Sequence, residues 1–157
     1  MSARRSMFTS RPALRGFTIV EALVALIVLA VGMLGIASLY VTTLRASGSA
    51  GSRMHAINLA SDLADRIRAN RTAEVAYAGA AATDGTTCLG TGASCTADQM
   101  AAHDLFVWQA AIQTALPGAP AGTVTVDVGT DPASYQIQVS WVEAGGVTQA
   151  YTLNMQI

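Results

Sequence analysis

The chain has 157 residues, of which 52% are hydrophobic and 12% are charged, and its formal net charge is −1. This length leaves room for one small domain besides a membrane anchor. Lysine is absent, and nothing in the sequence is typical of a nucleic-acid-binding surface, so a nucleic-acid partner is not expected.

The chain begins with a basic segment that contains Arg4, Arg5, Arg11 and Arg15 and no acidic residue. Arginines just before an apolar segment hold that end of a chain in the cytoplasm, so the remainder is expected to face outward. Without these four arginines, the rest of the chain has five arginines and ten acidic residues, and therefore a net charge of −5.

An apolar stretch follows over residues 16–41, GFTIVEALVALIVLAVGMLGIASLYV, and no charge occurs after Glu21 until Arg45. About 20 apolar residues in a helix match the hydrocarbon thickness of a bilayer, so we predict a transmembrane helix over residues 17–44. Gly32 and Gly35 lie in a small-residue patch that would let helices pack closely, although lipid tolerates such residues equally well.

Two other interpretations of this segment stay open. A cleavable secretory signal also begins with basic residues, and the small residues Ala37 and Ser38 could mark its cleavage site. The apolar core of such a signal has only about 7–15 residues, which fits this run poorly. The segment could also be a plain membrane anchor that is never processed.

Glu21 is an acidic residue inside the apolar run. A carboxylate in a membrane helix costs about 2.5–3.5 kcal/mol, which makes it a functional residue by default, although near the helix end it could reach the headgroups. A cut between Gly16 and Phe17 would create an α-amine one helical turn before Glu21. That amine would be largely cationic and able to pair with the carboxylate, within the chain or in a neighbour.

The stretch Gly16–Glu21, GFTIVE, with its basic leader and apolar tail, resembles the processing site of type IV prepilins. The resemblance implies that a prepilin peptidase cleaves after Gly16 and methylates the amine of Phe17. It also implies that Glu21 is the assembly acid, paired with the Phe17 amine of a neighbouring subunit. Such subunits wait in the inner membrane and are drawn into a filament whose core is packed apolar helices.

Three parts are therefore expected: a cleaved leader over residues 1–16, an assembly helix over 17–44 and a periplasmic head over 45–157. Glycine and serine at residues 46–52 weaken any helix, but helical periodicity resumes afterwards. Its apolar positions are Met54, Ile57, Ala60, Leu63, Ala64 and Ile67, with Asp62 and Arg66 spaced for a surface ion pair. Residues 62–71, DLADRIRANR, resemble the (A)DR(M/I)RAN segment of minor pilins of the PilV class.

Residues 72–97 have no clear period and are predicted to form a surface loop. Cys88 and Cys95 lie within it, and no histidine or other ligand cluster stands beside them, so a zinc site is not expected. In an oxidising periplasm they suit a disulfide, which would add about 2–3 kcal/mol by ordering a short loop. Free thiols are the alternative.

Thr96 and Gln99 form a capping-box pattern that predicts a second helix as far as about Leu116, stopped by Pro117-Gly118. Its apolar stripe is Leu105, Trp108, Ala111, Ile112 and Ala115. His55, His103 and Asp104 have no triad-like pattern and are expected to be surface polar residues. No common catalytic motif occurs either, so no enzyme, metal or cofactor is expected.

From Gly122 the apolar period changes to two, which predicts three antiparallel strands. Their apolar positions are Val124, Val126 and Val128, then Tyr135, Ile137, Val139 and Trp141, then Val147, Tyr151, Leu153, Met155 and Ile157. Gly145-Gly146 is a hairpin signal between the last two strands. The expected α+β fold is a long N-terminal helix packed on a small C-terminal antiparallel sheet, as in type IV pilins.

The resemblance implies a minor pilin, a structural subunit that primes pilus assembly with other minor pilins and supports adhesion and twitching motility. Its implied partners are the major pilin, a tip adhesin, the prepilin peptidase and inner-membrane lipid, and its implied final position is near the pilus tip. Two alternatives share parts of this description: a minor pseudopilin of a type II secretion system, and a membrane-anchored periplasmic binding module.

Overall fold

The computed structural model describes residues 16–79, 82–85, 88–90, 92 and 94–157. The leader expected over residues 1–16 lies outside them, apart from Gly16. The chain divides into two units, one that ends at Leu44 and one over Arg45–Ile157, and each is described by itself. The second unit is called the head below.

The first helix, α1, runs over Ile19–Ala69, 51 residues. It continues through the glycine-serine stretch that was expected to weaken it. Each glycine costs a helix about 1 kcal/mol relative to alanine, which packing of the following turns can offset. A hydrogen bond also holds this stretch, since Ser49 Oγ donates to Glu143 Oε1 at 2.7 Å.

The head continues with the short 3-10 helix η1 (Arg71–Ala73), the short helix α2 (Ala76–Gly79) and the long helix α3 (Ala97–Ala115). Strands β1 (Ala121–Asp127), β2 (Ser134–Val142) and β3 (Thr148–Gln156) then form an antiparallel sheet in the order β1-β2-β3. In this register Ile137 of β2 lies between Val124 of β1 and Leu153 of β3. The three-stranded sheet expected from the sequence is therefore confirmed.

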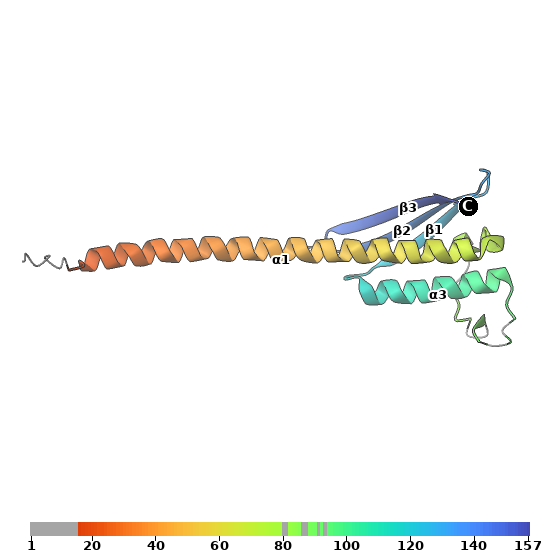
Figure 1. Ribbon diagram of the computed structural model, residues 1–157, viewed down its shortest axis with the longest axis horizontal. Coiled ribbons are helices and arrows are strands. Elements are labelled where there is room, and N and C mark those ends of the chain that lie inside the picture. The colour runs from red at the N-terminus through yellow and green to blue at the C-terminus, as the bar shows by residue number, and fades with distance from the viewer. Residues whose placement is uncertain (1–15, 80–81, 86–87, 91, 93) are drawn as a thin grey trace, which may run out of the picture. The chain divides into compact units, whose positions relative to one another are not determined.

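One face of the sheet packs against the helices. Four apolar side chains of β2 (Tyr135, Ile137, Val139 and Trp141) are buried, and so are the stripes of the two long helices (Ala56, Ala60, Leu63, Ala64 and Ile67 in α1; Ala101, Leu105, Trp108 and Ile112 in α3). Figure 1 shows α3 and the strands beside the head portion of α1. The opposite face of the sheet is polar and exposed.

Helix α3 lies close to β1 at Gly122. A Cβ atom there would overlap the indole of Trp108 and lie 2.5 Å from Cδ1 of Ile112. Gln109 Nε2 also donates to the carbonyl oxygen of Gly122 at 2.9 Å. The glycine therefore sets the distance between α3 and β1.

Several expected core positions differ from the structure. Met54 is 58% exposed, because the buried stripe of α1 begins at Ala56 and follows the side of the helix that faces the sheet. Val128 and Val147 are exposed because they stand beyond the ends of β1 and β3. The segment expected as a surface loop also supplies the core, since η1 and α2 bury Ala73 and Tyr77.

The hairpin between β2 and β3 is formed as the sequence predicted. Gly145 and Gly146 adopt φ values of +107° and +78°, which favour glycine. Glu143 N donates to Val147 O at 2.9 Å, and Gly146 N donates to Glu143 O at 3.0 Å. These two bonds close the turn.

Candidate functional site

The proposed cleavage site lies just before the first turn of α1. Gly16 and Phe17 are outside the helix, and the Phe17 side chain is 85% exposed. Thr18 Oγ1 accepts a hydrogen bond from Glu21 N at 3.3 Å, which caps the start of the helix. Glu21 is thereby held in the first helical turn, one turn after Phe17.

The apolar part of α1 carries large exposed side chains from Ile19 to Leu44. Within the described residues, α1 is the helix long and apolar enough to cross a membrane. Gly32 and Gly35 lie in this part, and a Cβ atom at either position would meet nothing within 4 Å. Their proposed role in helix packing stays a prediction.

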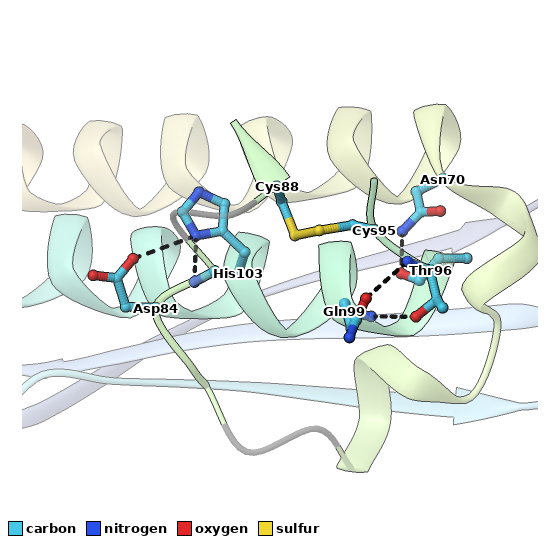
Figure 2. The surroundings of a disulfide bond; sticks show 9 residues. Asn70, Asp84, Cys88, Cys95, Thr96, Gln99 and His103 are labelled. Carbon is cyan, nitrogen blue, oxygen red and sulfur yellow. Dashed lines mark hydrogen bonds and ion pairs between the residues drawn. A yellow bond between two sulfur atoms is a disulfide. The ribbon is translucent and has the colours of Figure 1, made fainter. Parts of the chain in front are cut away.

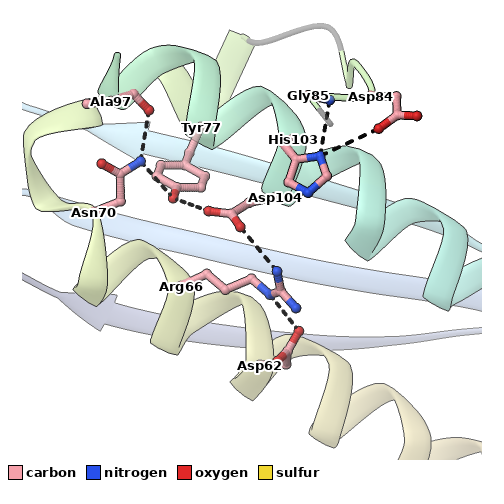
Figure 3. Close-up of polar contacts among 9 residues, drawn as sticks. All are labelled: Asp62, Arg66, Asn70, Tyr77, Asp84, Gly85, Ala97, His103 and Asp104. Carbon is pink, nitrogen blue, oxygen red and sulfur yellow. Dashed lines mark hydrogen bonds and ion pairs between the residues drawn. The ribbon is translucent and has the colours of Figure 1, made fainter. Parts of the chain in front are cut away.

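A cluster of polar side chains joins three helices of the head (Figure 3). Arg66 of α1 donates from Nε to Asp62 Oδ2 at 2.9 Å and from Nη1 to Asp104 Oδ1 at 3.1 Å. The hydroxyl of Tyr77 donates to Asp104 Oδ2 at 2.8 Å. Asn70 Nδ2 donates to that hydroxyl at 3.2 Å and to the carbonyl of Ala97 at 2.8 Å.

This cluster holds the helices of the head together through hydrogen bonds and an ion pair. Burial, reinforced by the neighbouring Asp104 carboxylate, raises the pKa of Tyr77, so the phenol stays protonated and able to donate. Burial opposes the charge of Arg66, but its hydrogen bonds with Asp62 and Asp104 outweigh burial and raise its pKa. Each group is thus held in the protonation state that its partner requires.

The expectation that His103 and Asp104 lie on the surface is wrong. They are 6% and 7% exposed and lie on the inner side of α3. Gly85 N donates to His103 Nδ1 at 3.1 Å, and Asp84 Oδ1 lies 3.8 Å from the same nitrogen. The imidazole therefore fastens the segment before the disulfide to α3 (Figure 3).

Spacing could have indicated the burial of Asp104. It stands three residues after Ala101 and four before Trp108, on the apolar stripe of α3. Its partners gave no such signal, because Tyr77 lies 27 residues away in a segment without periodicity. The role of Asn70 gave no signal either, because its partner Tyr77 lies in that segment.

The disulfide predicted between Cys88 and Cys95 is present (Figure 2). It closes a loop directly before the capping box of α3, in which Thr96 Oγ1 accepts from Gln99 N and Gln99 Oε1 accepts from Thr96 N. Cys88 is buried and Cys88 N donates to Gly85 O at 2.8 Å. The bridge therefore links the segment fastened by His103 to the start of α3.

In the part of the chain that the structure describes, no group of three or more His, Cys, Asp or Glu side chains could hold a metal ion. His103 and Asp104 are sequence neighbours but have different hydrogen-bond partners. His55 is exposed and lies in α1.

Two known families match the chain in adjacent segments. The prokaryotic N-terminal methylation motif matches residues 12–37, and the family described as type IV pilin Tt1218 matches residues 38–106. No curated protein and no solved structure matches the chain.

The matched segments include the proposed cleavage site, the polar cluster and the disulfide. The methylation motif covers Gly16–Glu21 and most of the apolar helix, and the pilin match extends through the head portion of α1, the disulfide loop and half of α3. An apolar helix with this motif fits anchoring in the inner membrane and incorporation into a pilus. The two matches together support a prepilin-type pilin, a structural subunit that assembles with other pilins after processing by a prepilin peptidase.

Proposed function

We propose that the chain is a minor pilin that is cleaved after Gly16, methylated at Phe17 and incorporated at low copy number into a type IV pilus. The observation that carries the proposal is the position of Glu21. It is the acidic residue of an otherwise uncharged apolar segment and stands one turn after an exposed, non-helical Gly16–Phe17 bond.

Physical chemistry supports this role for Glu21. Cleavage would leave a cationic amine at Phe17, next to the first turn of a helix whose dipole already favours an anion. In a filament, the apolar surface of α1 exchanges lipid for neighbouring helices, so its burial is kept. The carboxylate then requires a cationic partner, because an unpaired buried charge is strongly unfavourable. The amine of a neighbouring subunit provides one and would set the register between subunits.

The assignment as a minor pilin of the PilV class rests on the segment over residues 62–71. In the head this segment supplies Asp62, Arg66 and Asn70 to the polar cluster, so its sequence is tied to a definite packing arrangement. We propose that the subunit joins other minor pilins in a complex that primes assembly near the tip, with the major pilin and a tip adhesin as further partners. It would thereby support adhesion and twitching motility.

The decisive experiment determines the N-terminus and mass of the mature protein from the bacterium that makes it. A mature chain that begins at methylated Phe17 is expected. Gly16→Ala should leave a longer precursor, whereas Gly48→Ala should be processed normally because it lies in an exposed part of the head portion of α1. A mature chain that begins at Met1 would instead indicate an unprocessed anchor, and one that begins beyond Tyr40 would indicate a secretory signal.

A second experiment tests assembly. Glu21→Ala should be cleaved but scarcely found in filaments sheared from cells, and wild-type incorporation of this variant would contradict the pairing. Deletion of the gene should abolish twitching and leave protein secretion intact. Loss of secretion with normal twitching would assign the chain to a type II secretion system instead.

A further inference from the structure

The free edge of β3 presents main-chain groups that have no partner within the described residues. Val147 O accepts from Glu143 N, and Ile157 N donates to Ala133 O, so the odd-numbered residues of β3 direct their main chain toward β2. By alternation, the even-numbered residues direct theirs away from the sheet. These are Thr148, Ala150, Thr152, Asn154 and Gln156.

Nothing in β3 discourages pairing with another strand. Its nine residues, TQAYTLNMQ, include no charge, no proline and no glycine, and its register with β2 runs without a bulge from Thr148 to Gln156. Soluble proteins commonly protect edge strands with lysine, proline or bulges, because a long bare edge attracts further strands. An edge of this length without protection is expected to be covered when the protein is in use.

The opposite edge of the sheet, that of β1, is covered where the strand begins. By the same alternation, Gly122, Val124 and Val126 direct their main chain away from β2. The carbonyl of Gly122 is occupied by Gln109 Nε2, and Gln113 Nε2 donates to Pro120 O just before the strand. The edge of β1 is therefore closed at its start, and a second copy of the chain cannot offer that strand in full to β3.

Self-pairing of β3 is also disfavoured in a pilus. Two β3 strands that pair antiparallel across a two-fold axis would point their heads in opposite directions. Subunits that leave the same membrane with their N-terminal helices on the same side all point one way. An edge strand of a different pilin meets neither of these obstacles.

We infer that the outer edge of β3, over Ala150–Asn154, is a docking surface for an edge strand of a different pilin in the same filament. This inference rests on the proposed function. It adds a contact between heads to the contact between apolar helices. It also provides a reason why the chain would be a minor subunit, since its open edge does not fit a second copy of itself.

Substitutions at Thr152 test the edge in the full-length chain in its own host. Thr152→Pro removes an outward N–H without breaking the bonds to β2, and Thr152→Lys adds a charge at the edge. Gln138→Lys is the matched control, because Gln138 lies directly opposite Thr152 on the same exposed face but in the central strand. The amount of each variant in sheared filaments is measured relative to its amount in the membrane.

Both Thr152 variants should be at least about tenfold depleted from filaments, while wild type and Gln138→Lys are incorporated alike. The near-ultraviolet circular dichroism of the buried Trp108 and Trp141 verifies that each variant folds. An independent measurement needs no variant: the amides of Ala150, Thr152 and Asn154 should exchange at least about tenfold more slowly in filaments than in detergent-solubilised subunits.

The outcomes separate the two proposals. Wild-type incorporation of the Thr152 variants, or unchanged exchange of the three amides, would overturn the docking edge and leave the pilin function intact. A dimer of the purified wild-type chain that Thr152→Pro abolishes would overturn a different pilin as the occupant. Absence of the wild-type chain from filaments would overturn the proposed function and the docking edge together.

Discussion

The phenolic oxygen of Tyr77 lies 2.8 Å from Oδ2 of Asp104, and both side chains are buried, at 1% and 7% exposure. The contact fastens α2 to α3, while the other carboxylate oxygen accepts from Arg66 of α1. Three helices thus meet at one carboxylate. Because its two oxygens have separate partners, removal of either partner leaves a buried acceptor without compensation.

Tyr77→Phe is therefore expected to lower the free energy of unfolding of the head by about 1–3 kcal/mol. The loss arises because Asp104 Oδ2 and Asn70 Nδ2 both lose a partner, although the ring still fills its place in the core. Thermal unfolding followed by the near-ultraviolet circular dichroism of the buried tryptophans measures it. Tyr40→Phe, in the apolar part of α1 outside the head, is the control and should change the stability of the head by less than about 0.5 kcal/mol.

The raised pKa of Tyr77 also predicts an alkaline limit. Burial stabilises the neutral phenol in the folded head, so this contribution to stability is complete below pH of about 10, the pKa of an unperturbed tyrosine. Above that pH, stability falls by up to about 1.4 kcal/mol per pH unit, because the unfolded chain loses its proton first.

The stability difference between wild type and Tyr77→Phe isolates this effect. It should be constant from pH 7 to about 9 and shrink above pH of about 10. The pKa of Tyr135 is also raised, by burial and by the nearby Glu74, but Tyr135 is present in both proteins and cancels. A difference that does not change up to pH 11 would contradict the prediction.

Two glycine-to-alanine substitutions should have opposite signs. Gly122→Ala forces a methyl group into Trp108 and Ile112 and is expected to cost about 1–3 kcal/mol or more. Gly48→Ala places the same methyl group in open space on α1 and should stabilise the helix by about 0.5–1 kcal/mol. Denaturant unfolding of both variants tests the pair, and a neutral Gly122→Ala would mean that α3 and β1 are not in close contact.

Local patterns predicted most of the fold. The capping box at Thr96, the alternation in the strands and the Gly145-Gly146 turn each depend on residues that are close in sequence, so each can be predicted from a short stretch of the chain. The polar cluster could not be predicted in this way, because Arg66, Tyr77 and Asp104 come from three separate segments. Their pairing is decided by how the helices pack, and no spacing along the chain encodes it.

The N-terminal site differs from the cluster in this respect. Gly16, Phe17 and Glu21 lie within six consecutive residues, so their pattern is visible in the sequence without knowledge of the fold. The environment of His103, in contrast, depends on residues far from it in sequence. Its sequence neighbours indicate a surface residue, but Gly85 N and the disulfide segment cover it.

Loss of the Cys88–Cys95 bridge should act locally on α3. The Cys88→Ser/Cys95→Ser chain is expected to be about 2–3 kcal/mol less stable, because the bridge no longer restricts the conformations of this loop in the unfolded chain. The first turn of α3 should open most readily, since Thr96 and its capping box follow Cys95 directly. Hydrogen exchange should therefore accelerate more at Gln99 and Met100 than at Ile137 in the central strand, whose amide opens only when the whole head unfolds. Reduction of the wild-type chain should reproduce this pattern and leave the double-serine chain unaffected. Equal acceleration at Ile137 would mean that the bridge stabilises the whole head instead of the start of α3.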